Sequence, residues 1–398
     1  PYAVLGKLDD TGHLRVVDRL LNDDPVDMPL EILLGKAPKT IMRVERTRES
    51  PTRAAFGGID IEEACKRVLR FPTVADKTFL IHIGDRTVGG LVTRDQNVGP
   101  WQVPVSDVAV TCLDYEGYRG EAMSMGERTP VAVTSPAAAG RLAVGEAVMN
   151  IAAADVPALD QVRLSANWMA ASGVVGEDEA LFDTVSAVAA FCRELDIAIP
   201  VGKDSLSMRT KWDQDGDEYQ VVAPVSLIVS AFAPVEDVRR TVTPQLLTDD
   251  ETCLCLIDLG AGRDRLGGSS LAQVYEIAGG ETADLDEPAK LGSAFALLRD
   301  LIRDGVVLAY RDRSDGGVFA TICEMAFAGR RGVELDLDAS CDPVGALFAE
   351  ELGAVFQLRN ADVEHVQRRF DAAGLGDIVT RLGDVVGGER VRISHGDI

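Results

Sequence analysis

The sequence predicts two domains that each combine helices with a β-sheet, of the α+β and α/β classes. Its 398 residues are 46% hydrophobic, which is enough for two or three ordinary domains with cores of their own. Expected helices and strands come in mixed order up to about residue 235, and they alternate from about Pro244 onward. Both orders are typical of domains in which helices cover a sheet.

The first forty residues predict the end of a domain whose beginning is missing. A hairpin is expected from two strand-like runs, residues 2–5 and 14–17, with a turn at 9–12. The charged stretch 43–51 has the composition of a linker. Forty residues are too few to form a core alone, and the strand-like start at Pro1 has no Met before it. We therefore expect a piece of a longer polypeptide.

The elements beyond the linker follow from hydrophobic periodicity. Before residue 235, helices are expected at 61–69, 137–154 and 179–195, and strands at 79–83, 103–112 and 221–232. After Pro244, strands are expected at 253–259, 306–309 and 354–358, and helices at 291–304, 318–329 and 361–373.

Composition excludes several classes of function. The net charge is −24, and the 40 Lys and Arg residues are scattered, which argues against a nucleic-acid-binding surface. An anionic small molecule would need metal ions or local dipoles. No transmembrane stretch or signal peptide is visible. The seven cysteines form no Cys-x-x-Cys pair and no Cys/His cluster, so we expect a cytoplasmic protein without disulfides or zinc.

The helix expected at 137–154 carries two polar side chains in an apolar run. Glu146 and Asn150 stand one turn apart, so they share a stripe of the helix. A carboxylate buried there would need a cation or hydrogen-bond donors to offset its lost hydration. A metal bound to a nucleotide is the candidate cation. The alternative is an Ala-rich surface helix whose two polar residues face water.

The segment DRSDGG at 312–317 is the most specific local signal. It follows a strand-like run and precedes a helix, and such a turn presents backbone N–H groups to an anion. Because Asp312 and Asp315 would repel a bare phosphate, phosphate binding here would require a bridging cation, most naturally magnesium. The alternative is a helix cap with glycines for turn geometry.

Two further positions have weaker signals. Asp107 is the single charge of a strand-like run, and alternation favours a solvent-facing side chain. With Glu146, Asn150 and Asp312 it would nevertheless complete an all-oxygen set suited to magnesium. Lys203, in GKDS at 202–205, could reach a phosphate from a loop or lie free on the surface, but the segment lacks the first glycine of a Walker motif.

None of the histidines predicts a general base. They lie in an expected hairpin, strand, polar helix and C-terminal tail without Cys or Ser partners, so we expect structural or solvated roles and no catalytic residue in this chain. The four are His13, His82, His365 and His395.

An ordered set of segments resembles large-type phosphoribosylformylglycinamidine synthase, and the resemblance runs essentially through the whole chain. The segments are DRTVGG at 85–90, RDQNVGPWQVP at 94–104, GEAM at 120–123, GER at 126–128, LAVGEA at 142–147, LSANWM at 164–169, GKDS at 202–205 and DRSDGG at 312–317. The segment around Trp101 and the Ser-Ala-Asn-Trp run are the most specific.

The resemblance implies a pair of domains like those of aminoimidazole ribonucleotide synthetase. Residues 1–44 would be the tail of a preceding synthetase half and 45–54 a linker. Residues 55–235 would form the N-terminal-type mixed-sheet domain of the second half, and 236–398 its C-terminal-type α/β domain. The rest of the synthetase and a glutaminase domain would belong to the same longer chain.

The resemblance also implies a reaction and a site. The family uses ATP, glutamine and water to convert formylglycinamide ribonucleotide into its amidine in purine biosynthesis. The second half is similar to an auxiliary site that holds ADP and magnesium. The family's metal ligands fall on Asp107, Glu146, Asn150 and Asp312. Its nucleotide contacts fall on Ser106 and Ser314, and Lys203 is added from its chemistry alone.

Three functions remain open for this piece of the ligase. The first is a direct contribution to catalysis, and the second is a structural nucleotide-binding module that is inactive alone. The third is a free-standing relative such as aminoimidazole ribonucleotide or selenophosphate synthetase. We favour the structural module because no base or glutaminase cysteine is visible. The missing half is expected to cover an apolar sheet face, so the isolated fragment should dimerise or aggregate.

Overall fold

The computed structural model of the chain describes residues 1–36, 41–47, 53–84, 86–87, 90–247 and 251–396. It divides into two units, residues 1–44 and 45–398. The middle of the expected linker, residues 48–52, lies outside the described residues. We describe each unit by itself.

The smaller unit is a hairpin followed by one short helix. Strand β1 (His13–Asp18) pairs antiparallel with β2 (Asp23–Pro29), and α1 (Leu30–Leu34) follows directly. None of its described residues is buried. The expected pairing of residues 2–5 with 14–17 is wrong. The Asp18 carboxylate accepts the N–H groups of Leu20 and Leu21 at 2.8 and 3.0 Å, which turns the chain forward onto β2.

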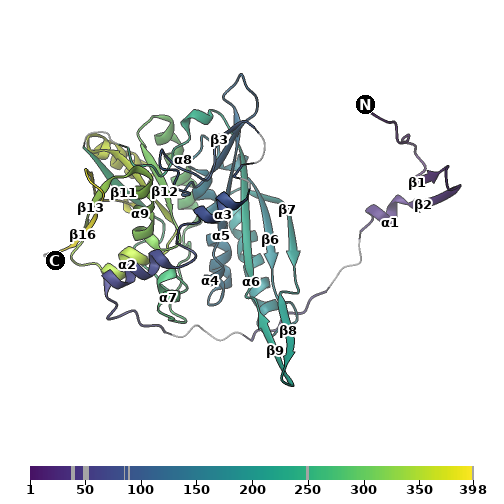
Figure 1. Cartoon of the computed structure of the whole chain (residues 1–398), viewed down its shortest axis with the longest axis horizontal. Coiled ribbons are helices and arrows are strands. Elements are labelled where there is room, and N and C mark those ends of the chain that lie inside the picture. Colours follow the sequence, from purple (N-terminus) through teal and green to yellow (C-terminus); the bar gives the residue numbers. More distant parts are fainter. Residues whose placement is uncertain (37–40, 48–52, 85, 88–89, 248–250, 397–398) are drawn as a thin grey trace. The chain divides into compact units, whose positions relative to one another are not determined.

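The larger unit contains two six-stranded sheets (Figure 1). The first sheet is antiparallel except for one parallel pair, β6 with β7. Its strands, in spatial order, are β3 (Val92–Arg94), β4 (Ala109–Cys112), β5 (Gly120–Glu127), β10 (Ser226–Val235), β6 (Arg163–Met169) and β7 (Ala198–Ser205). Buried and exposed residues alternate along β5 and β10, as expected for strands with one face on a core.

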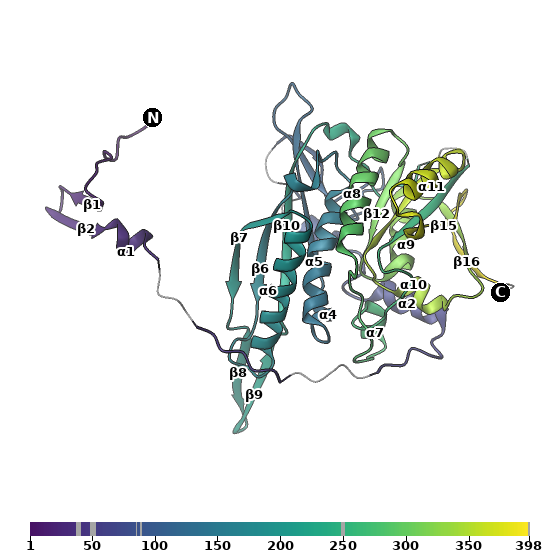
Figure 2. The ribbon, with the colours of Figure 1, turned by 180° about the vertical axis from the view of Figure 1, so that it is seen from behind.

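One face of this sheet is covered by helices, and α5 lies closest to it (Figures 1 and 2). The helices are α4 (Thr129–Ala132), α5 (Pro136–Ile151) and α6 (Glu177–Glu194). Small residues let α5 approach its neighbours. A Cβ at Gly126 of β5 would lie 2.2 Å from the Ala143 carbonyl oxygen, and one at Gly140 would lie 2.8 Å from Thr184 of α6. Helix α5 is therefore buried on nearly every side.

The second sheet is antiparallel except for the parallel pair β13 and β16. Its strands, in spatial order, are β12 (Ala309–Arg313), β14 (Gly353–Arg359), β11 (Thr252–Asp258), β15 (Val379–Val386), β13 (Gly332–Leu337) and β16 (Val391–His395). Residues of α8 (Pro288–Arg303) and α11 (Val363–Ala372) share one continuous hydrophobic core with α5 and the first sheet.

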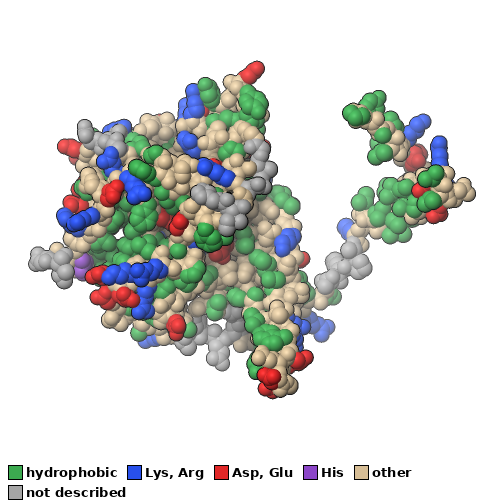
Figure 3. Space-filling model, viewed as in Figure 1, with side chains coloured by type: hydrophobic (Ala, Val, Ile, Leu, Met, Phe, Trp, Pro, Cys, Tyr) green, Lys and Arg blue, Asp and Glu red, His purple; other side chains and the backbone are tan. Residues whose placement is uncertain are grey.

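The other face of the second sheet carries α9 and a group of shorter helices. Helix α9 (Gly317–Gly329) contributes to a core against the sheet and to another with its helical neighbours, and its Ala328 packs with Val98 and Val105. These neighbours are α2 (Ile61–Arg70), α7 (Ser270–Val274) and α10 (Pro343–Phe348). A separate two-stranded hairpin, β8 (Arg209–Gln214) with β9 (Asp217–Val222), carries hydrophobic side chains and an acidic tip (Figure 3).

Most long helices and core strands lie where periodicity predicts them, and four short segments differ. Residues 79–83 belong to helix α3 (Thr78–Ile83), because the Asp76 carboxylate accepts the Thr78 N–H at 3.0 Å and starts a helical turn. Residues 103–108 precede β4, since Pro104 cannot donate to a ladder. Residues 221–225 lie outside β10, and residues 306–308 lie outside β12.

The GKDS segment at 202–205 also differs from its prediction. It is part of strand β7 and not a loop, and Gly202 pairs with Ala166 of β6. A Cβ at position 202 would lie 2.2 Å from the Ala166 carbonyl oxygen. The glycine is therefore needed for the close approach of β7 to β6. In the part of the chain that is described, no helix is long and apolar enough to cross a membrane.

The close contact of α5 with β5 makes a testable prediction. We expect Gly126→Ala to lower the free energy of unfolding by about 2 to 3 kcal/mol, because the new methyl group meets rigid backbone of α5. Gly387→Ala is the matched control, since its Cβ meets nothing within 4 Å. Denaturant titration of both variants checks this, and equal midpoints would contradict the packing described.

Candidate functional site

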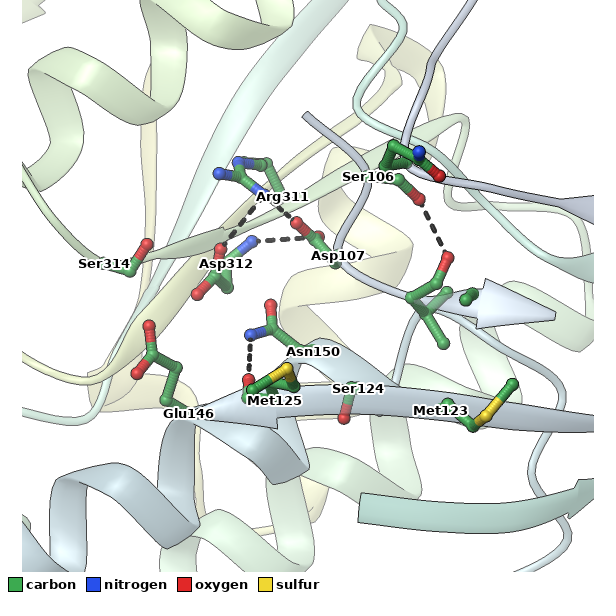
Figure 4. A pocket seen from close by; sticks show the side chains of 13 residues that line it. Ser106, Asp107, Met123, Ser124, Met125, Glu146, Asn150, Arg311, Asp312 and Ser314 are labelled. Atoms are coloured by element: carbon green, nitrogen blue, oxygen red, sulfur yellow. Dashed lines mark hydrogen bonds and ion pairs between the residues drawn. The ribbon is translucent and has the colours of Figure 1, made fainter. Parts of the chain in front are cut away.

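A polar pocket of about 360 Å³ opens where α5, β5 and β12 come together (Figure 4). Its wall also includes the segment before β4 and the turn after β12. The lining residues are Gln96, Ser106, Asp107, Val108, Ala109, Met123, Ser124, Met125, Glu146, Asn150, Arg311, Asp312 and Ser314. The pocket therefore joins three parts of the chain that are distant in sequence.

Six of the seven predicted site residues line this one pocket. They are Ser106, Asp107, Glu146, Asn150, Asp312 and Ser314. Lys203 lies elsewhere: it is exposed on β7, and its Nζ donates to the Ser205 hydroxyl at 3.0 Å. The structure thus brings together all the predicted oxygen ligands and places Lys203 away from them.

Glu146 and Asn150 face the pocket and not the solvent, so the surface-helix alternative is wrong. The Glu146 side chain is 13% exposed, and its Oε2 accepts the Glu127 N–H at 2.8 Å. Asn150 donates from Nδ2 to the Met125 carbonyl oxygen at 2.9 Å. Its buried Oδ1 has no hydrogen-bond partner among the described residues and points toward Asp107 and Asp312 (Figure 4).

Asp107 is buried, which corrects the solvent-facing placement that strand alternation favoured. Its Oδ1 forms an ion pair with Arg311, and its Oδ2 accepts the Asp312 N–H at 3.2 Å. Arg311 Nη1 is also 3.5 Å from Asp312 Oδ1. Asp107 turns inward because residues 103–108 are not in a strand, so period-two alternation does not apply to them.

A second buried arginine lies beside Glu146. Arg128 is 4% exposed, and its Nη1 donates to Asp315 Oδ1 at 2.6 Å. It is also 3.6 Å from Glu350 and 4.0 Å from Glu146. This guanidinium therefore connects the end of β5 with the turn after β12 and with the segment before β14.

Burial dominates the electrostatics of the pocket carboxylates. Lost hydration raises the pKa of Asp107 to about 8, although Arg311 opposes the shift and Asp312 adds to it. Lost hydration likewise raises the pKa of Glu146 to about 8, with Arg128 opposing. The two arginines therefore compensate the buried negative charge only partly. A further cation in the pocket would be favoured.

The turn at 312–317 has the predicted form of strand, glycine turn and helix N-terminus. Gly316 and Gly317 adopt φ of +83° and +67°, which side chains rarely tolerate. The Gly316 N–H, however, donates to the Glu350 carboxylate at 2.6 Å, and the Gly317 N–H donates to the Ser314 carbonyl oxygen at 3.0 Å. These two groups are thus satisfied within the protein, and the expectation that they are free for an anion is wrong.

The residues fit a magnesium ion that a ligand helps to hold. Among the described residues, no three His, Cys, Asp or Glu side chains converge closely enough to bind a metal by themselves. Magnesium commonly takes only one or two carboxylates and completes its shell with phosphate oxygens and water. The unpartnered Asn150 Oδ1 and the carboxylates of Glu146 and Asp312 suit that arrangement.

Sequence reasoning missed both arginines. Arg311 lies between two buried residues, Tyr310 and Asp312, whereas Arg128 is buried between partly exposed neighbours. A charge within an otherwise buried strand was the available signal for Arg311.

Two regions of the chain match known domain families. Residues 76–234 match the FGAR-AT PurM_N-like domain, and residues 255–396 match the C-terminal domain of AIR synthase related protein. The chain thus contains PurM N-like and C-like domains in the AIR synthase-like two-domain fold, which confirms the expected fold class.

Solved structures of PurL and of HypE share this fold. Thermotoga maritima PurL complexed with FGAR has a TM-score of 0.60 and 12% identity, over 92% of this chain and 53% of that chain. The same protein complexed with ATP has a TM-score of 0.54 and 11% identity, over 74% and 44%. A chain of the HypE-HypF complex has a TM-score of 0.51 and 14% identity, over 73% and 90%. The chain spans about half the length of the PurL chains that it matches.

The buried position of Arg128 makes a stability prediction. We expect Arg128→Met to lower the free energy of unfolding by about 3 to 5 kcal/mol, because it leaves Asp315 and Glu350 without their buried cation. Arg392→Met is the control, since Arg392 pairs with Glu334 at 2.8 Å on the surface and should have no resolvable effect. Chemical denaturation compares the two. A similar loss in both variants would refute a special role for the buried arginine.

Proposed function

We propose that the pocket binds a magnesium–nucleotide complex, and that the chain is the second synthetase half of phosphoribosylformylglycinamidine synthase. The observation that carries the proposal is the polar pocket in which Glu146 and Asp312 face the unpartnered Asn150 Oδ1. The PurM N-like and C-like domains support the class, and the PurL complexes with ATP, ADP and FGAR support the ligand.

Each group has a distinct part in this binding. Glu146, Asn150 and Asp312 hold the magnesium ion, which neutralises phosphate charge when bound. Ser106 and Ser314, which line the pocket, contact the nucleotide. Asp107 is a candidate metal ligand as well. Glu127 orients Glu146 through its backbone N–H, and Met125 orients Asn150 through its carbonyl oxygen.

In the proposed ligase, ATP and glutamine convert formylglycinamide ribonucleotide to formylglycinamidine ribonucleotide in purine biosynthesis. This half serves as an auxiliary nucleotide module that stabilises the catalytic half, and it is inactive alone. A free-standing relative is the second candidate, favoured because the match to the HypE-HypF chain covers 90% of that chain. Ammonia-dependent turnover by this chain alone would overturn the structural-module proposal.

The same proposal explains residues 1–44 and gives a partner to the exposed apolar face of the first sheet. Residues 1–44 have no core and are proposed to be the tail of the preceding half. The outer face of the first sheet exposes Met125, Phe232 and Val201, which are 59%, 43% and 61% exposed. We propose that the preceding half covers this face, and that a glutaminase domain completes the enzyme.

Nucleotide retention tests the site. We expect the double variant Glu146→Ala/Asp312→Ala to lose magnesium-dependent ADP binding by at least about tenfold, because two oxygen ligands are removed. Calorimetric titration with ADP and MgCl₂ measures the loss. The control is Asp213→Ala/Glu364→Ala, which removes the same two charges from exposed positions. Full ADP binding by the pocket variant would refute the assignment.

Self-association tests the apolar face. We expect the isolated chain to form dimers or larger species, and Met125→Lys/Phe232→Lys to shift it toward monomer, because charges on a buried contact are costly. Light scattering after size exclusion gives the mass. Val185→Lys, on the exposed side of α6, should leave the mass unchanged. A monomeric unmodified chain would contradict the proposal.

A further inference from the structure

Arg311 occupies the space between two carboxylates of the pocket, where a metal ion could otherwise bind. Its Nη1 pairs with Asp107 Oδ1 and lies 3.5 Å from Asp312 Oδ1. The same nitrogen donates to the Val105 carbonyl oxygen at 3.1 Å. Figure 4 shows the guanidinium directed at both carboxylates from the same strand that carries Asp312.

The guanidinium is held from its other side as well. Its Nε and Nη2 lie 2.8 and 2.7 Å from the Glu324 carboxylate of α9. The side chain is only 14% exposed. Moving it would leave Glu324 and Asp107 as unpaired buried charges, which is strongly unfavourable. Arg311 is therefore a fixed part of the pocket.

The Asp107 side of the pocket and the α5 side, which carries Glu146 and Asn150, differ in how many oxygen atoms are free to bind a ligand. Both oxygens of Asp107 are engaged, one by Arg311 and one by the Asp312 N–H. On the other side, Asn150 Oδ1 is buried and unpartnered, and the described contacts of Glu146 involve Oε2 alone. The unsatisfied oxygen ligands therefore gather on the α5 side.

We propose that Arg311 is a resident cation that replaces one divalent ion, so that the pocket binds a single divalent ion between Glu146, Asn150 and Asp312. Asp107 then positions Arg311 and does not ligate the metal. With both Asp107 oxygens engaged, Glu146, Asn150 and Asp312 remain as oxygen ligands for one divalent ion. This inference rests on the proposed function and narrows it, because it sets the metal stoichiometry of the bound nucleotide.

The stoichiometry of metal to nucleotide tests the proposal. The whole chain is equilibrated by dialysis against MnCl₂ and ADP, and bound manganese and adenine are quantified. We expect one manganese per adenine in the unmodified chain. In Arg311→Gln, Asp107 becomes free and the ratio should rise to two, with the two ions close enough to couple in the electron paramagnetic resonance spectrum. Arg311→Gln/Asp107→Asn should return the ratio to one.

Matched variants separate the possible failures. Arg392→Gln, which removes an exposed arginine, should keep the ratio at one. Two ions per adenine in the unmodified chain, or one in folded Arg311→Gln, would overturn the inference and leave nucleotide binding intact. No adenine bound to the unmodified chain would overturn the proposed function itself. Should Arg311→Gln not fold, the ratio in the unmodified chain still decides the inference.

Discussion

The close packing of helix α5 is the constraint on which the rest of the larger unit depends. Because Gly126 and Gly140 have no side chain, α5 packs closely against the first sheet and α6 packs closely against α5. A Cβ at Gly145 would likewise lie 2.6 Å from Leu352, which precedes β14. The Tyr310 hydroxyl donates to the Met149 carbonyl oxygen at 2.8 Å and anchors β12 to the end of the helix. A helix surrounded in this way can place a polar side chain only where a polar pocket receives it.

That constraint explains the charge arrangement of the pocket. Glu146 and Asn150 are largely withdrawn from solvent, so the surrounding elements supply partners. These partners are backbone groups of β5, and arginines whose positions depend on both sheets. Carboxylates outnumber the arginines that face them, and burial keeps the pKa values of Asp107 and Glu146 high. Such a pocket holds its polar groups in place before any ligand arrives, and it favours an additional cation.

Much of the fold followed from the sequence because long helices and core strands have unambiguous periods. Helices α5, α6, α8 and α9 were predicted within a few residues. Short apolar runs were less predictable, since the period of residues 79–83 fits a strand and a helix equally well, and the structure forms a helix there. Strand partners were not predictable either, because pairing of β1 with β2 depends on a turn and not on hydrophobicity.

The sequence by itself indicated Glu146 and Asn150 as candidate site residues, because polar side chains inside an apolar run require partners wherever the run is buried. The family resemblance then assigned Asp107 and Asp312 to this candidate set. The sequence also indicated the turn at 312–317, whose glycines are needed for positive φ. Only the tertiary structure decided which partners these residues have. Arg311 meets Asp107 across 204 positions, and Arg128 meets Asp315 across 187. Contacts at such separation depend on how the two sheets pack around α5, and no local pattern specifies them.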